Sequence, residues 1–151
     1  MLRTRLNEVL KDAMRSKKQR TVSTVRLIMA ALKDRDIAAR TRGVTDGIDE
    51  DEIMSMLQTM IKQRREAIEL YEQGGRLELA EQEREEIGII EDFLPKQMSE
   101  DEIRSAVTTV IGDIGASSVK DMGRTMAELR TRYAGRMDFG KASGIVRQVL
   151  A

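Results

Sequence analysis

Residues 93–102, FLPKQMSEDE, interrupt a chain whose apolar residues otherwise recur at helical spacing. Pro95 is the only proline among the 151 residues, and its ring disfavours helical backbone at the residue before it. Ser99 precedes Glu102 by three residues, which is the spacing of a capping box at a helix start. We therefore predict an N-terminal helical domain over residues 1–94, a proline hinge over 95–99 and a C-terminal tail domain over 100–151.

On the N-terminal side of this stretch, apolar residues recur every three or four positions, the pattern of helices with one buried face. The short polar interruption at residues 16–20 predicts an antiparallel helical hairpin. Asp49, with Glu52 three residues later, indicates another helix start, and Gly74 with Gly75 indicates a stop. About four helices are predicted here, with apolar stripes over residues 2–14, 22–32, 53–71 and 77–94.

On the C-terminal side, three further helices are predicted. The first carries the stripe that begins at Ile103, and Gly112 and Gly115 are expected to end it. Ser118 to Asp121 starts the second, with Val119 on its buried side, and Asp138 caps the third, which buries Val149 among others. No strand-like alternation occurs, so the sequence predicts an all-α protein.

The composition excludes several kinds of active site. The chain has no cysteine and no histidine, which removes disulfides, thiol nucleophiles and Ser-His-Asp arrangements. The acidic runs at 49–52 and 100–102 match neither a calcium loop nor a carboxylate–histidine di-iron pattern, and both stand at predicted helix starts. The glycines form no phosphate-binding loop. We expect no metal, no cofactor and no catalytic residue, and hence no catalysis by this chain alone.

The longest apolar run, Leu27 to Leu32, is six residues, far short of the roughly 20 that span a bilayer. No export signal is visible at the N-terminus. The sequence therefore predicts a cytoplasmic protein without a membrane partner.

Charge is distributed unevenly, although 26 basic and 26 acidic side chains balance overall. Residues 1–42 carry twelve basic and four acidic side chains, residues 43–115 seven and nineteen, and residues 116–151 seven and three. The basic ends are either solvated helix faces or contacts for a polyanion. Aromatic residues are too few for a base-stacking platform, so backbone contacts to structured RNA fit the tail better. The candidate contacts are Lys120, Arg124, Arg130, Arg132, Arg136 and Lys141.

Within this set, Lys120 and Arg124 are four residues apart, which predicts that they share one helix face opposite Val119, Met122 and Met126. Arginine suits such contacts because its guanidinium binds phosphate with a bidentate fork.

Several stretches also resemble a known family. They are residues 20–33 (RTVSTVRLIMAALK), 71–80 (YEQGGRLELA), 93–100 (FLPKQMSE) and 115–124 (GASSVKDMGR), followed by Gly135, Arg136 and Asp138. Together they resemble the GatB/YqeY family, specifically its stand-alone YqeY-like proteins, over essentially the whole chain. The resemblance implies a two-part helical protein, homologous to the C-terminal region of the B subunit of the tRNA-dependent amidotransferase.

In that larger enzyme, the glutamine- and ATP-using chemistry lies in other domains, while the helical and tail regions help to hold tRNA. The resemblance therefore implies an accessory module that binds tRNA or other structured RNA, with a tRNA-charging or amidotransferase protein as a possible partner. Carry-over of tRNA contacts is firmest for Lys120, Arg124 and Arg136. Phe139 departs from the family, which commonly has glycine there, so backbone contacts at that turn are in question.

Two alternatives remain open from the sequence. In the first, the chain is a protein–protein interaction module whose basic ends serve electrostatic steering. In the second, it takes part in carbon–nitrogen ligase activity, with glutamine as amido-N-donor, only within a larger amidotransferase assembly.

Overall fold

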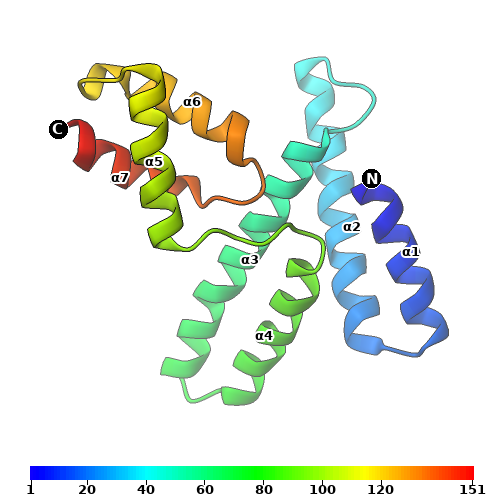
Figure 1. Cartoon of the computed structure of the whole chain (residues 1–151). Helices are drawn as coiled ribbons and strands as arrows, with labels where there is room; N and C mark the ends of the chain where they lie inside the picture. Colours follow the sequence, from blue (N-terminus) through cyan, green and yellow to red (C-terminus); the bar gives the residue numbers. More distant parts are fainter. The chain divides into compact units, whose positions relative to one another are not determined.

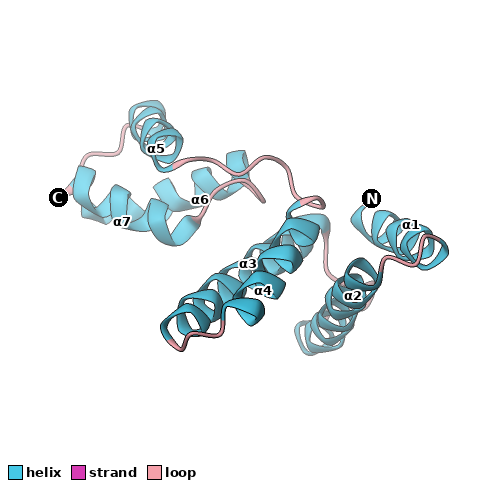
Figure 2. Ribbon diagram, turned by 90° about the horizontal axis from the view of Figure 1, so that it is seen from below, coloured by secondary structure: helices cyan, strands magenta, loops and turns pink.

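The computed structural model describes the whole chain, residues 1–151, as seven α-helices and two short 3₁₀ turns without any strand (Figures 1 and 2). The predicted all-α class is confirmed. The chain divides into two compact units, Met1–Pro95 and Lys96–Ala151, which are described separately below as unit 1 and unit 2. None of the helices combines the length and apolar character needed to cross a bilayer.

Unit 1 contains two helical hairpins. Its elements are α1 (Leu2–Arg15), α2 (Gln19–Ala39), η1 (Arg40–Arg42), α3 (Glu50–Gln73) and α4 (Leu77–Glu91). The α1–α2 hairpin is the one expected from the short polar interruption, and α3 and α4 form the second. Helix α2 packs against α1 on one side and against α4 on another (Figure 1).

The core of unit 1 lies where these helices meet, and the predicted stripes supply most of it. Val25, Ile28, Leu57 and Ile90 are fully buried there. Two residues that were predicted on buried stripes are exposed instead: Met14 is 52% exposed and Leu77 is 65% exposed. Each lies in a terminal turn of its helix, and spacing alone does not reveal where a neighbouring helix stops covering it.

Helix ends follow local side-chain chemistry. The Asp49 carboxylate accepts a hydrogen bond of 2.9 Å from the Glu52 backbone N–H at the start of α3. Ser99 and Glu102 form the predicted reciprocal capping box at the start of α5. Gly115, at φ +66°, ends α5, but Gly112 does not, because the helix continues through it to Ile114.

Unit 2 is a three-helix arrangement of α5 (Glu100–Ile114), η2 (Val119–Asp121), α6 (Met122–Tyr133) and α7 (Phe139–Leu150). Each helix packs against the other two, around buried Ile103, Val107 and Leu129 among others. Val119 and Val149 were predicted to be buried but are 50% and 45% exposed. Val119 lies in the 3₁₀ turn rather than in α6, and Val149 lies in the last turn of α7.

Candidate nucleic-acid interface

All six predicted contact residues are exposed, and they lie on three elements and one loop of unit 2. Lys120 is in the 3₁₀ turn η2, and Lys141 is in the first turn of α7. Arg136 lies in the loop between α6 and α7. The other three, Arg124, Arg130 and Arg132, are on α6.

Lys120 and Arg124 do not share one α-helical face, so that prediction is wrong. Ser118 and Asp121 form a capping box around η2, and α6 begins only at Met122. The capping chemistry therefore produces a tight 3₁₀ turn at Lys120 rather than the first turn of α6. Because α6 is twelve residues long, about 18 Å separates its two ends, and Lys120 lies at the end away from the α6–α7 loop.

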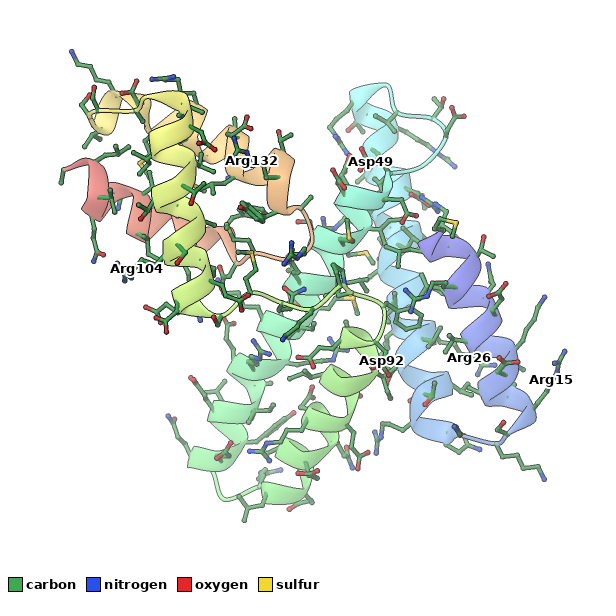
Figure 3. All side chains as sticks on the ribbon, in the orientation of Figure 1. Arg15, Arg26, Asp49, Asp92, Arg104 and Arg132 are labelled. Atoms are coloured by element: carbon green, nitrogen blue, oxygen red, sulfur yellow. The ribbon has the colours of Figure 1, made fainter.

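Two of the four arginines in the predicted set are neutralised within unit 2. Arg132 Nη1 lies 2.8 Å from Asp113 Oδ2 on α5, and its Nε lies 2.9 Å from Glu128 Oε1 (Figure 3 labels Arg132). These hydrogen bonds, first to Asp113 and then to Glu128, raise the pKa of Arg132. Arg124 donates to the Ile114 carbonyl oxygen at 2.9 Å and pairs with Asp121 at 3.1 Å. Both arginines therefore link α6 to the C-terminal end of α5.

Two other arginines lie over aromatic rings and have no carboxylate partner. The Arg130 guanidinium carbon is 5.6 Å from the centroid of the Phe139 ring, and that of Arg136 is 6.0 Å from the Tyr133 ring. Neither arginine forms a salt bridge within unit 2. A ring restrains a guanidinium by cation–π attraction without cancelling its charge. Neither guanidinium has a salt-bridge partner, and Arg136 acts on a carboxylate only at longer range: the Ser99 backbone N–H is the main cause of the lowered pKa of Glu102, with smaller contributions from Lys96 and Arg136.

The loop that carries Arg136 is anchored by two hydrogen bonds from the adjacent residues 97 and 98. The Met98 backbone N–H donates to the Arg136 carbonyl oxygen at 2.8 Å, and Gln97 Nε2 donates to the Gly135 carbonyl oxygen at 2.6 Å. Gly135 and Met137 are both buried, and Gly135 adopts φ +76°, which only glycine adopts readily. Arg136 is thus held at the surface between two buried neighbours.

Phe139 lies outside this loop, as the first residue of α7 after the Asp138 cap. Its φ is not positive, so its backbone has no need of glycine. Its half-buried ring packs against the core of unit 2 and lies beneath Arg130. Phe139, in place of the family's glycine, therefore does not disturb the backbone of the turn. Its ring contacts the guanidinium of Arg130.

Arg130, Arg136 and Lys141 consequently gather at the connection between α6 and α7, and we call these three residues the turn cluster. Arg130 reaches the start of α7 through the Phe139 ring, and Lys141 is two residues beyond Phe139. Lys141 forms no salt bridge; its backbone N–H donates to Asp138 Oδ1 at 3.1 Å. Lys120 is separated from the cluster by the length of α6.

All three acidic side chains of residues 116–151 are already engaged inside unit 2. Asp121 accepts from the Ser117 N–H at 2.8 Å and pairs with Arg124, and these contacts lower its pKa. Glu128 pairs with Arg132, and Asp138 caps α7. Five cations of this segment have no carboxylate within 4 Å: Lys120, Arg130, Arg136, Lys141 and Arg147.

Arg147 is the residue that the sequence-based set omits. It is exposed in the last turn of α7, the helix against which η2 packs, and so lies toward the Lys120 end of unit 2. Its basic charge was visible in the sequence, but nothing in the sequence showed that α7 returns alongside η2.

The chain belongs to the family described as Yqey-like protein, whose model matches residues 3–150. It is 29% identical over 94 residues to the uncharacterized protein C22F3.15 of Schizosaccharomyces pombe, covering 62% of this chain and 72% of that protein. It is also 29% identical over 115 residues to the mitochondrial protein named Altered inheritance of mitochondria protein 41 of Lachancea thermotolerans, covering 75% of this chain. The latter match spans 59% of that protein's length.

Proposed function

We propose that this member of the Yqey-like protein family is an accessory module that binds structured RNA, tRNA foremost, through the turn cluster of unit 2. The observation that carries the proposal is the charge pairing of residues 116–151. Every acid there is engaged internally, while five exposed cations have no carboxylate partner. Such a surface attracts a polyanion and has little internal competition for it.

The turn cluster suits phosphate better than bases. Tyr133 and Phe139 already lie against Arg136 and Arg130, so these two rings of unit 2 are engaged and do not form an open stacking platform. The guanidinium groups are restrained by those rings, and the loop backbone is held by Gln97 and Met98. Cations that are positioned before binding lose less conformational entropy on contact with the RNA backbone. Recognition by shape and phosphate position, as with folded RNA, fits this arrangement.

We assign no chemical step to this chain. Where the chain serves amide formation with glutamine as nitrogen donor, it does so by holding tRNA within a larger amidotransferase assembly. The relevant partners are then tRNA and a tRNA-charging or amidotransferase protein, and the place of action is the cytoplasm.

The pairing pattern predicts different results for different arginines. Arg130→Ala, Arg136→Ala and Lys141→Ala should each weaken tRNA binding and lower the slope of log affinity against log salt by about 0.7–0.9. Arg132→Ala should change this slope less, because its charge is already held by Asp113 and Glu128. The measurement is a fluorescence-anisotropy titration of labelled tRNA at several salt concentrations.

A matched control removes the same charge from unit 1. Lys11, Arg35 and Lys62 are exposed and form no salt bridge, so the triple alanine variant at these positions has the same net charge as the turn-cluster triple variant. If both triple variants lose tRNA affinity equally, generic electrostatics explains the binding and the assignment to the turn cluster is wrong.

A further inference from the structure

Helix α2 has apolar side chains on its solvent-facing side as well as on its core side. Leu27 is 49% exposed and Ile37 is 47% exposed, and Ala30 and Ala38 between and beside them are also exposed. Their spacing places them on one side of α2, with exposed Asp34 between Ala30 and Ile37, and we call this side the α2 stripe. Scattered exposed apolar side chains need no explanation, so only Leu27, which lines a groove, bears on a contact surface.

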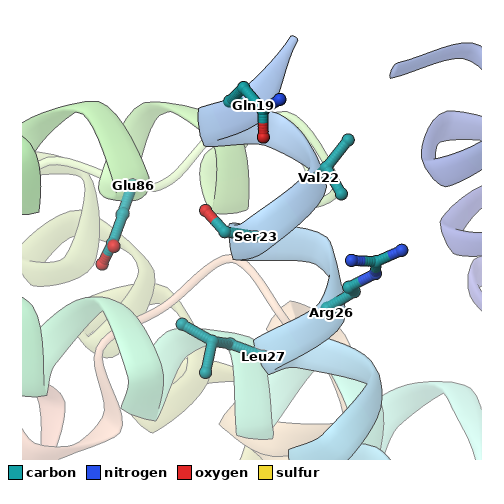
Figure 4. Close-up of a pocket in the computed structure, with 6 residues that line it drawn as sticks. All are labelled: Gln19, Val22, Ser23, Arg26, Leu27 and Glu86. Carbon is teal, nitrogen blue, oxygen red and sulfur yellow. The ribbon is translucent and has the colours of Figure 1, made fainter. Parts of the chain in front are cut away.

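A groove of about 410 Å³ between α2 and α4 lies at the N-terminal end of this stripe. Figure 4 shows Ser23 and Leu27 pointing from α2 toward the side on which α4 carries Glu86. Val22 and Leu27 supply the apolar lining. The groove is lined by Gln19, Val22, Ser23, Arg26, Leu27 and Glu86.

Of the two charged residues that line this groove, Arg26 is the one without a salt bridge. Glu86 lies 2.9 Å from Arg64, and Glu85 lies 3.2 Å from Arg20, so both carboxylates that border it are paired. Arg26 forms no salt bridge. Lys33 and Asp34, about two turns further along α2, are both exposed and both without a salt bridge, so their charges offset each other. An apolar segment that carries carboxylates therefore matches the groove.

The turn between α3 and α4 carries exposed leucines and carboxylates without salt bridges, which complement Leu27 and Arg26 of the groove. Leu70 is 69% exposed and Leu77 is 65% exposed, on either side of the Gly74–Gly75 turn. Three exposed acids stand beside them and form no salt bridge, with Arg76 as the only free cation of the turn. These acids are Glu66, Glu69 and Glu78. We call residues 66–78 the α3–α4 tip.

We propose that a second copy of this chain occupies the groove, inserting Leu70 and Leu77 of its α3–α4 tip against Leu27, with the tip carboxylates facing Arg26. Within one copy the two patches do not cover each other, since all three leucines remain exposed. The α1–α2 turn, from which the groove begins, and the α3–α4 turn lie at the same end of unit 1 (Figure 1). In a two-fold symmetric dimer, the tip of each copy would bind in the groove of the other copy.

The first test is sedimentation equilibrium of RNA-free protein from low to high micromolar concentration. The weight-average mass should rise from that of one chain toward that of two, and the rise should shrink at high salt because exposed charges are screened. A mass of one chain at every concentration would overturn the proposal.

Variants then locate the contact. Leu27→Ser and Leu70→Ser both change exposed side chains, and each should weaken self-association about tenfold or more. Val149→Ser, a matched exposed position in unit 2, should leave it unchanged. Self-association that survives either leucine change would exclude the tip-in-groove contact, even if the chain is dimeric.

A charge exchange distinguishes a second copy from a different acidic partner. Arg26→Glu and the double change Glu66→Lys with Glu69→Lys should each weaken self-association, because like charges then face each other. An equimolar mixture of the two variants should associate more tightly than either variant alone. A mixture that stays monomeric would contradict the pairing of Arg26 with the tip. None of these measurements contains RNA, so their outcome is independent of the proposed RNA binding.

Discussion

Thr24 and Thr125 are two fully buried threonines that differ in one contact. The Thr125 hydroxyl donates to the Asp121 carbonyl oxygen at 2.8 Å, whereas the Thr24 hydroxyl has no hydrogen-bond partner. Thr24→Val removes an unsatisfied buried polar group and should raise the free energy of unfolding by about 1 kcal/mol. Thr125→Val should lower it by about 1 kcal/mol. Urea unfolding followed by circular dichroism measures both, and equal signs would contradict this explanation.

Asp36 links α2 to the start of α1 and to the loop before α3. Both its oxygens accept from Arg3 at 2.8 Å, and one also accepts from the Ile48 N–H at 2.9 Å. These contacts, that with Arg3 first, lower the pKa of Asp36 from 3.8 to about 2. A carboxyl with a depressed folded-state pKa stabilises the fold above its unfolded pKa, and this contribution disappears as pH falls through the folded value.

We therefore expect Asp36→Asn to lower the free energy of unfolding by about 1–2 kcal/mol at neutral pH, since Arg3 is partly exposed and its attraction is screened. The difference between the variant and the parent protein should shrink between pH 4 and pH 2. Unfolding curves at a series of pH values test this, and a difference that does not change with pH would refute it.

Two glycines inside helices can be replaced by alanine with a gain in the free energy of unfolding. A Cβ added at Gly88 in α4 or Gly144 in α7 would meet no atom within 4 Å. Alanine at either position should raise the free energy of unfolding by about 0.5–1 kcal/mol, because it restricts the unfolded chain without a clash. Gly115→Ala should have the opposite effect and lower the free energy of unfolding. The backbone at Gly115 has a φ of +66°, which is strained for any other residue. Thermal unfolding of the three variants decides the matter.

Helix starts were predictable because their chemistry is local. Asp49, Ser99 and Asp138 each accept from a backbone N–H three residues away, so spacing in the sequence identifies the contact. Burial in terminal turns was not predictable in the same way. Leu77 and Val149 fit their stripes, yet they remain exposed because coverage depends on a neighbouring helix that the spacing does not describe.

In the candidate site, too, the sequence predicts the residue types but not the contacts that depend on helix packing. The sequence reveals that Arg132 and Arg136 are basic, but not which of them is neutralised. Asp113, the partner of Arg132, lies nineteen positions away on another helix, so only the packing of α5 against α6 reveals the pair. The sequence also hides the anchoring of the Arg136 loop, because that anchor comes from Gln97 and Met98, more than 35 residues earlier.

For the whole molecule, the two hydrophobic cores are separate clusters, one in each unit. We expect the units to open independently, and Ile53 and Ile103 offer a matched pair, since each is 1% exposed in its own core. Ile103→Val should cost about 1 kcal/mol and speed amide hydrogen exchange about fivefold in unit 2 only. Ile53→Val should do the same in unit 1 only. Faster exchange throughout the chain in either variant would mean that the units unfold together.

A direct titration tests RNA binding by unit 2. We would measure binding of the purified full chain to deacylated tRNA and to an RNA duplex of similar length, at low and moderate salt. We expect salt-sensitive binding that favours tRNA and weakens when Arg130, Arg136 and Lys141 are changed to alanine. Equal weak binding to both RNAs, or none at low salt, would contradict it and favour a role in protein–protein interaction.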